Sequence, residues 1–146
     1  MPTYTLTTTA NRLTPAQKAR LAAEITRVHN QLMRAATFFA QVIIHEVPEG
    51  SYFVGGKPLQ GDQVFLLGQV RTGRSAVDRK ALLQALRDVV AETTGVPLNR
   101  AWVYLVDVPA RDMIEYGHIL PEPGDETSWM EGLPEQDRAL MLATGA

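Results

Sequence analysis

The chain has 146 residues, of which 45% are hydrophobic and 21% charged, with no cysteine and a formal net charge of −2 at pH 7. This composition is typical of one globular domain covering 1–146, and it excludes disulfide bonds, thiolate metal sites and a cysteine nucleophile. The charge gives no reason to expect nucleic acid or a membrane surface as a partner, and no apolar stretch reaches the roughly 18 residues that a membrane span requires. The start, MPTYTLTTTANR, lacks the basic and apolar regions of a signal peptide, so we expect a cytoplasmic protein.

Pro2 directly follows the initiator methionine, and two interpretations of it are open. Proline is tolerated at the first residue of a strand, because its missing N–H is not needed there. If Met1 is removed, for which a small second residue is permissive, Pro2 instead carries a free secondary amine that no ordinary side chain supplies. The position alone does not decide between the two.

The pattern over residues 3–47 predicts a strand, a helix and a second strand. TYTLTTT at 3–9 alternates and is rich in threonine, and FAQVIIHEV at 39–47 is β-branched and aromatic, as is typical of strands. Between them, Thr14 is a good N-cap for a helix over 14–34. Apolar side chains recur along that helix at a spacing that forms one buried face, at Leu21, Ile25, Val28 and Leu32.

A second copy of this unit follows a loop, PEGSYFVGGKPLQG, at 48–61. QVIIHEVP at 41–48 aligns without gaps with WVYLVDVP at 102–109, an offset of 61 residues (from 41 to 102). The same offset places Thr14 on Ser75, another good N-cap. The chain therefore contains an internal repeat of one supersecondary unit.

These elements predict an α/β (α+β) fold of two β-α-β units, about 2–48 and 63–109, which form a four-stranded sheet with two helices on one face. The strand, helix and strand of the second unit are expected at 63–70, 75–94 and 101–108. The tail, 110–146, is expected to add a hairpin and a short helix near 134–142. The uncovered face of the sheet remains partly apolar, so we expect the chain to oligomerise.

The turn RTGRS at 71–75 places two arginines beside the start of the second predicted helix. Gly73 allows a tight turn between Arg71 and Arg74, and guanidinium groups bind carboxylates as a fork. The free amides at a helix start also favour anions, so the turn is a candidate site for a small anion. The alternative interpretation is that both arginines simply face water.

Three further residues are candidates whose structural and functional interpretations both stay open. His29, at the boundary of the apolar helix face, either packs or donates to a ligand oxygen. Tyr104, within a strand, is typical of core packing with its hydroxyl at an edge. Glu115, between apolar residues, either points outward or has a raised pKa and acts as a general base. Metal binding is not expected, because His29, His45 and His118 show no ligand-like spacing.

Together these residues make the chain resemble the tautomerase superfamily, specifically its cis-3-chloroacrylic acid dehalogenase-like branch. The resemblance spans nearly the whole chain and is carried by the initial MPTY, by RLTPAQKARLAAEITRVH at 12–29, by VRTGRSA at 70–76 and by WVYLVDVPARDMIEYGHILPEPG at 102–124. It implies the same doubled β-α-β fold, a homotrimer that covers the open sheet face, and no metal or organic cofactor.

The resemblance also implies a set of site residues. Pro2 matches the catalytic amino-terminal proline of the family, and Tyr104 and Glu115 match the pair that activates a water molecule. The residues that match the binding site for the carboxylate of a small substrate are His29, Arg71 and Arg74.

Two reactions are implied, and they differ in the role of Pro2. In hydrolytic dehalogenation of a cis-3-haloacrylate, protonated Pro2 delivers a proton to C2 while the activated water attacks C3. In tautomerisation of a 2-oxo acid such as phenylpyruvate, neutral Pro2 moves a proton between oxygen and carbon. The sequence leaves both open, together with the identity of the physiological substrate.

Departures from the dehalogenase predict that dehalogenation is weak. Ala35 and Phe39 stand where that enzyme has threonine and leucine, and the loop 50–61 also differs, so the pocket loses a hydroxyl and gains an aromatic ring. We therefore expect low or promiscuous dehalogenase and hydratase activity together with tautomerase activity on 2-oxo acids. The alternatives are a dedicated cis-3-haloacrylate dehalogenase and a non-catalytic βαβ-repeat module that binds a small carboxylate.

Overall fold

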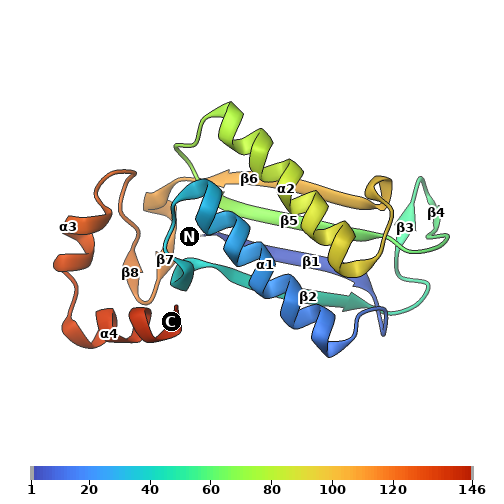
Figure 1. Ribbon diagram of the computed structural model, residues 1–146, viewed down its shortest axis with the longest axis horizontal. Coiled ribbons are helices and arrows are strands. Elements are labelled where there is room, and N and C mark those ends of the chain that lie inside the picture. Colours follow the sequence, from blue (N-terminus) through green and yellow to red (C-terminus); the bar gives the residue numbers. More distant parts are fainter. Residues whose placement is uncertain (1, 146) are drawn as a thin grey trace.

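The computed structural model describes residues 2–145, so the question whether Met1 is removed lies outside the described residues. Two β-α-β units join into one four-stranded sheet, as predicted (Figure 1). Their elements are β1 (Thr3–Thr9), α1 (Pro15–Met33), β2 (Gln41–Val47), β5 (Val64–Arg71), α2 (Ala76–Thr94) and β6 (Ala101–Val108). No helix within this range is both long and apolar enough to cross a membrane.

The strand order brings four segments of the chain to one edge of the sheet. The strands lie in the order β2-β1-β5-β6, with β1 parallel to β2, β5 parallel to β6, and the central strands β1 and β5 antiparallel. β1 and β2 therefore begin where β5 and β6 end, with Thr3 opposite Gln69 and Arg71 opposite Val108. The start of the chain thus lies at the same edge as the arginine-containing turn that follows β5 (Figure 1).

Side-chain caps define the start of both long helices. The Thr14 hydroxyl accepts a hydrogen bond from the Gln17 N–H, and the Gln17 side chain accepts one from the Thr14 N–H. The Ser75 hydroxyl accepts from the Asp78 N–H in the same way. These bonds satisfy amides that have no partner within the helix, which is why the helices begin at these residues.

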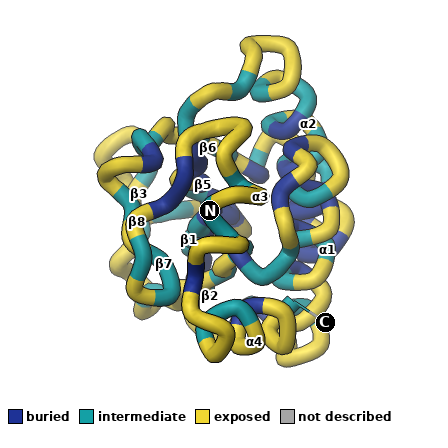
Figure 2. Tube along the Cα trace, turned by 90° about the vertical axis from the view of Figure 1, so that its left-hand side faces the viewer, coloured by how far each residue is buried: buried dark blue, intermediate teal, exposed yellow. Residues whose placement is uncertain are grey.

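Both helices cover the same face of the sheet and leave the other face open (Figure 2). The largest fully buried apolar side chains between the helices and the sheet include Tyr4, Leu6, Leu21, Ile25, Leu66, Leu82 and Leu86. Because side chains alternate along a strand, the neighbours of core residues point to the opposite face. That face exposes the large apolar side chains of Ile43, Trp102, Tyr104 and Val106.

The loop predicted over 48–61 contains a short hairpin of β3 (Phe53–Val54) and β4 (Lys57–Pro58). Its two turn residues, Gly55 and Gly56, have φ of 62° and 74°, a left-handed conformation that glycine adopts without strain. Two adjacent glycines between extended residues could have indicated this hairpin.

The structure differs from the prediction in two details. The C-terminal tail contains two helices where one was expected, and β2 begins at Gln41 rather than at residue 39, because a 3-10 turn precedes it. The 3-10 turns are η1 (Thr37–Phe39), η2 (Leu98–Arg100) and η3 (Ala110–Asp112). The tail consists of a hairpin and two helices, β7 (Ile114–Glu115), β8 (His118–Ile119), α3 (Glu126–Glu131) and α4 (Glu135–Thr144).

Gly68, in the middle of β5, makes room for the ring of Tyr4 in β1. The two residues are directly opposite each other in the sheet. A Cβ atom at Gly68 would lie 2.6 Å from Cε1 of Tyr4 and 2.8 Å from Cδ2 of Leu105, which is closer than packed atoms tolerate. Glycine inside a strand commonly marks such a close approach.

Substituting Gly68→Ala is expected to lower the free energy of unfolding by about 2 kcal/mol, because the added methyl group overpacks the core. Chemical denaturation at one fixed protein concentration measures the change. Gly132→Ala is the matched control, since a Cβ there meets only backbone oxygens at 3.5 and 3.6 Å and φ is −78°. Equal stabilities of the two variants would contradict the assigned packing.

Candidate active site

All three residues predicted to bind a carboxylate lie around one small cavity. His29 from α1, Arg71 from the end of β5 and Arg74 from the following turn line a space of about 10 Å³. That volume is close to the space one water molecule requires. The same edge of the sheet thus brings together a histidine and two arginines that are far apart in the sequence.

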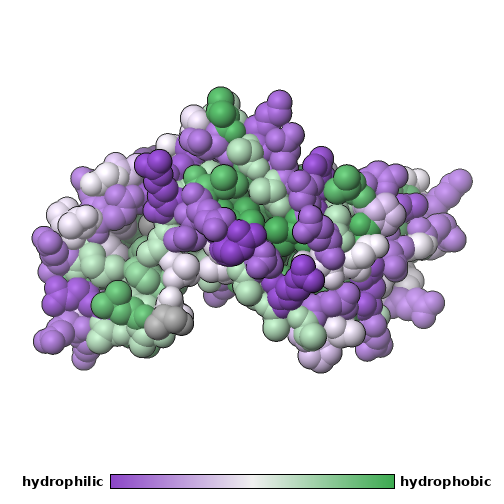
Figure 3. Space-filling view, viewed as in Figure 1, coloured by the Kyte–Doolittle hydropathy of each residue, from purple (hydrophilic) through white to green (hydrophobic). Residues whose placement is uncertain are grey.

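A larger cavity of about 390 Å³ adjoins the small one. The two share Met33, Ala35, Arg71 and Arg74 in their walls. The rest of the larger cavity is lined by the residues that follow α1, by η1 and by α3. Figure 3 shows the molecule hollowed between the C-terminal segment, at the left, and the helices. A ligand with one anionic end could place that end near the arginines and its remainder in the larger space.

Arg71 is buried, and the C-terminal tail holds its guanidinium. Nη1 donates to the carbonyl oxygen of Pro121 at 2.7 Å, and Nη2 donates to the carboxylate of Glu126. The buried Nε–H has no hydrogen-bond partner among the described residues. An unsatisfied donor in a buried cation is costly, so a ligand oxygen that accepted this N–H would be stabilised.

Arg74 is half-buried and, within residues 2–145, makes no hydrogen bond or ion pair. Burial lowers the pKa of Arg74, and the positive charge of Arg71 lowers it further. The turn that positions it is tight, because Gly73 has a φ of 101° and a Cβ atom there would lie 2.8 Å from Cγ of Pro123. Its guanidinium is therefore the group most open to direct contact with an anion.

His29 is buried, and its Nδ1 lies 2.7 Å from the hydroxyl of Tyr4. Burial lowers the pKa of His29 to about 3, with a contribution from the positive charge of Arg74. Burial also raises the pKa of the Tyr4 hydroxyl, so both groups are uncharged near neutral pH. When Tyr4 donates to Nδ1, the imidazole proton is on Nε2, which can then donate to an oxygen of a ligand.

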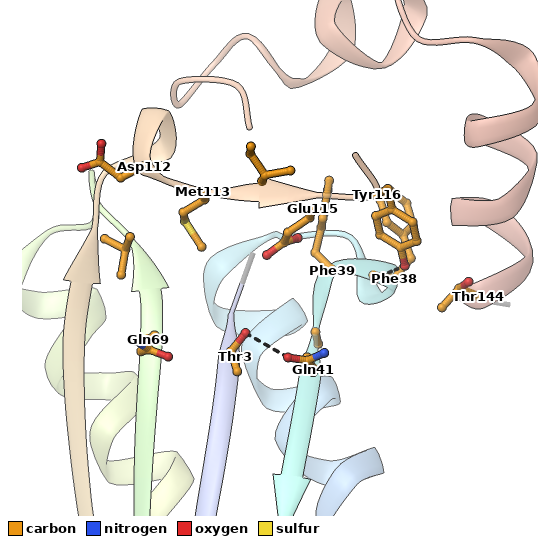
Figure 4. Close-up of a pocket in the computed structure, with 13 residues that line it drawn as sticks. Thr3, Phe38, Phe39, Gln41, Gln69, Asp112, Met113, Glu115, Tyr116 and Thr144 are labelled. Atoms are coloured by element: carbon orange, nitrogen blue, oxygen red, sulfur yellow. Dashed lines mark hydrogen bonds between the residues drawn. The ribbon is translucent and has the colours of Figure 1, made fainter. Parts of the chain in front are cut away.

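Glu115 lines a different cavity, of about 660 Å³, at the same edge of the sheet. It is the last residue of β7, before a two-residue turn in which Tyr116 and Gly117 have φ of 53° and 84°. Figure 4 shows Glu115 extending from this hairpin, in the cavity that Thr3 and Gln41 also line at the starts of β1 and β2. The sequence-predicted base is therefore near the start of the chain but not among the arginines.

The rings of Phe38 and Phe39 line both the Glu115 cavity and the larger arginine cavity. The hydroxyl of Tyr116 donates to the carbonyl oxygen of Phe38 at 2.7 Å, and the ring of Trp129 lies 6.0 Å from that of Phe39. Contacts from the tail therefore hold this aromatic pair between the two cavities.

Pro2 is buried and immediately precedes β1, where its carbonyl oxygen accepts a hydrogen bond from the Gln41 N–H at 3.0 Å. Thr3 is paired with Gln69, so the adjoining backbone of Pro2 lies at the end of the sheet where β5 approaches Arg71. Tyr104 lies elsewhere. It is 56% exposed on the open face of the sheet, paired with Leu67 in mid-strand, and lines none of these three cavities.

Tyr4 and Glu126 were not indicated as site residues by the sequence. Tyr4 alternates into the core like any strand residue, and only the glycine at Gly68 signals that a large ring needs space there. Glu126 lies in a segment with no apolar periodicity, so nothing local connects it to Arg71, which is 55 residues earlier in the chain.

Residues 1–132 match the family described as "Putative oxalocrotonate tautomerase enzyme", and the chain belongs to this tautomerase family. The resemblance seen in the sequence is thereby confirmed. No protein with a curated description matches the chain.

Solved structures give the same result for the fold. N1, a member of the cis-3-chloroacrylic acid dehalogenase family, has a TM-score of 0.92 at 28% identity, over 97% of this chain and 99% of its own. Pt0534, inactivated by 2-oxo-3-pentynoate, has a TM-score of 0.74 at 28% identity, over 81% and 94%. A fused 4-OT solved as a symmetric trimer has a TM-score of 0.70 at 22% identity, over 76% and 89%.

The buried His29 makes folding depend on pH. The folded protein keeps its imidazole neutral to about pH 3, whereas the unfolded chain takes up a proton near the ordinary pKa of 6.5. Stability is therefore complete above about pH 6.5 and is lost as the pH falls below it, by up to about 1.4 kcal/mol per pH unit. His29→Gln is expected to flatten this part of the profile, measured by chemical denaturation between pH 7.5 and pH 5. Parallel profiles for the two proteins would show that His29 is not buried in neutral form.

Proposed function

We propose that the protein is an enzyme that acts on small carboxylates through its amino-terminal proline and needs no cofactor. In this proposal Met1 is removed and Pro2 transfers the proton. The activities are slow hydrolytic dehalogenation or hydration of cis-3-haloacrylates and tautomerisation of 2-oxo acids such as phenylpyruvate.

The observation that carries the proposal is the meeting of His29, Arg71 and Arg74 around one small cavity at the sheet edge where Pro2 begins the fold. Among the described residues, Arg74 makes no hydrogen bond or ion pair, the Nε of Arg71 is unsatisfied, and a neutral His29 can add a third donor. Three convergent donors with two positive charges suit a carboxylate better than a neutral group.

For a 3-haloacrylate, these donors would draw electron density toward the carboxylate and make C3 electrophilic. Glu115 would take a proton from a water molecule as its oxygen attacks C3, and protonated Pro2 would deliver a proton to C2. The product carries hydroxyl and halogen on the same carbon, so it loses hydrogen halide to give malonate semialdehyde. Support for the role of Glu115 comes from its place in the cavity beside the start of β1.

For a 2-oxo acid, the same donors would hold the carboxylate while neutral Pro2 transfers a proton between oxygen and carbon. The size and composition of the larger cavity favour this reaction with an aromatic substrate. Its volume of about 390 Å³ and its walls of Phe38, Phe39 and Trp129 suit a phenyl ring next to the arginines.

The same walls argue against efficient dehalogenation. Ala35 lines both arginine cavities and has no hydroxyl to bind the substrate or a water molecule. The ring of Phe39 leaves an apolar surface between the arginines and the cavity of Glu115. The two positions are those at which the sequence departs from the dehalogenase that it resembles.

We further propose a homotrimer in which the open sheet face is buried. That face exposes Ile43, Trp102, Tyr104 and Val106, and an apolar surface of this kind is typical of an interface. The solved trimer of fused 4-OT shares the fold. Tyr104 lines none of the three cavities described above in its own protomer, so in the trimer it would act in the site of a neighbouring protomer.

Arg74→Ala is expected to lower kcat/KM about 100-fold for both cis-3-chloroacrylate and phenylpyruvate, since it removes the charged group that contacts the carboxylate most directly. Steady-state assays with these substrates measure the effect. Assays with trans-3-chloroacrylate test whether the enzyme distinguishes the two isomers of the haloacrylate. The Arg74 side chain makes no hydrogen bond or ion pair with residues 2–145, so the melting temperature should change little.

Arg20→Ala is the control, because it removes the same charge from an exposed position on α1. An unchanged kcat/KM in Arg74→Ala would rule out its role in binding the carboxylate. A specialised rate on the cis-haloacrylate in the wild-type enzyme would instead identify a dedicated dehalogenase.

A further inference from the structure

A carboxylate of the protein itself is bound to one of the arginines of the candidate site. Glu126, the first residue of α3, accepts a hydrogen bond from Nη2 of Arg71, and the two form an ion pair. The arginine side chain is 4% exposed, whereas the glutamate side chain is 43% exposed. The negative charge therefore lies at the boundary between the buried arginine and the larger cavity, which both residues line.

The position of this carboxylate is fixed from several sides. Its second oxygen accepts from the Gly124 N–H at 2.9 Å. Pro121 accepts from the same guanidinium, and Pro123 packs against Gly73 in the arginine turn. The hydrogen bond from Arg71 lowers the pKa of Glu126, so the carboxylate is ionised near neutral pH.

The charged side chains around the larger arginine cavity, of about 390 Å³, are mostly positive. Of the residues that the structure describes, its walls contain three guanidinium groups, from Arg34, Arg71 and Arg74, and one carboxylate, that of Glu126. Without that carboxylate, every charged side chain in the wall would be positive. Charge–charge energies in such a partly exposed site amount to about 1 kcal/mol or more at short range.

We propose that Glu126 is a specificity-determining residue that weakens the binding of ligands with two negative charges more than that of ligands with one. The inference rests on the proposed function, because it concerns the same carboxylate-binding site. A monocarboxylate places its charge beside Arg74 and its uncharged remainder in the larger cavity. A dicarboxylate also places a second negative charge in the larger arginine cavity, where the Glu126 carboxylate repels it.

The physical reason is that the energy of a ligand in the field of Glu126 scales with the charge of the ligand. Removing the glutamate charge should therefore tighten binding of a dianion by about the square of the factor for a monoanion. For a partly screened charge we expect about threefold for a monocarboxylate and about tenfold for a dicarboxylate.

Isothermal titration calorimetry with butyrate and succinate, both of four carbons, tests the proposal at low ionic strength, where screening is weakest. The affinity of the wild-type protein for succinate relative to butyrate is the reference, because its cavity wall keeps more positive than negative side chains with Glu126 ionised. In Glu126→Gln, which can still accept a hydrogen bond from Arg71, succinate should gain about tenfold and butyrate about threefold. Binding is measured without turnover, so a failure of the proposed catalytic activity would leave this result interpretable.

Glu122→Gln is the matched control, because it removes an equal charge from an exposed residue of the same segment. Glu126→Asp, which keeps the charge but shortens the side chain, should retain the wild-type preference. Weaker binding of both acids to Glu126→Gln would show that the residue only positions Arg71, and unchanged binding would show that its charge is not felt; either overturns the proposal. Glu126→Ala is a second neutral variant, in which the affinity for succinate relative to butyrate should also rise about threefold. An unchanged ratio in whichever neutral variant folds would also overturn the proposal.

Discussion

Burial of the Arg71 guanidinium is the constraint on which the rest of the site depends. A cation that is almost completely removed from water loses several kcal/mol of solvation, which partners must replace. Both of its partners, the carbonyl of Pro121 and the carboxylate of Glu126, come from the C-terminal tail. The tail is therefore fixed against the end of β5, and through Trp129 it also forms part of the wall of the larger arginine cavity.

The two arginines differ in their partners and in the roles proposed for them. Arg71 is engaged by the protein and contributes a fixed positive charge and one unsatisfied N–H, whereas Arg74, with no hydrogen bond or ion pair among the described residues, is the one proposed to contact a ligand directly. The neutral His29 adds a donor without adding charge. The antiparallel pairing of β1 with β5 then brings the start of the chain to the same edge, as the proposed role of Pro2 requires.

Local features of this fold could be predicted from the sequence, whereas contacts between distant segments could not. Helix caps and apolar periodicity depend on residues within a few positions of one another, and they located both β-α-β units. The pair of Arg71 and Glu126 joins positions 55 residues apart, so no short pattern contains it. The contact between His29 and Tyr4 has only an indirect trace in the sequence, the glycine at Gly68 that makes room for the tyrosine ring.

The most direct test of the central claim is covalent labelling of the amino terminus by 2-oxo-3-pentynoate, the compound that inactivates Pt0534. A free Pro2 nitrogen near the carboxylate site would add to the triple bond, which becomes a double bond as the neighbouring carbon takes up a proton. No atom is lost, so mass spectrometry should find one whole molecule of the compound per chain, on the peptide that begins with Pro2. An active preparation that retains Met1, or that is labelled only elsewhere, would contradict the account.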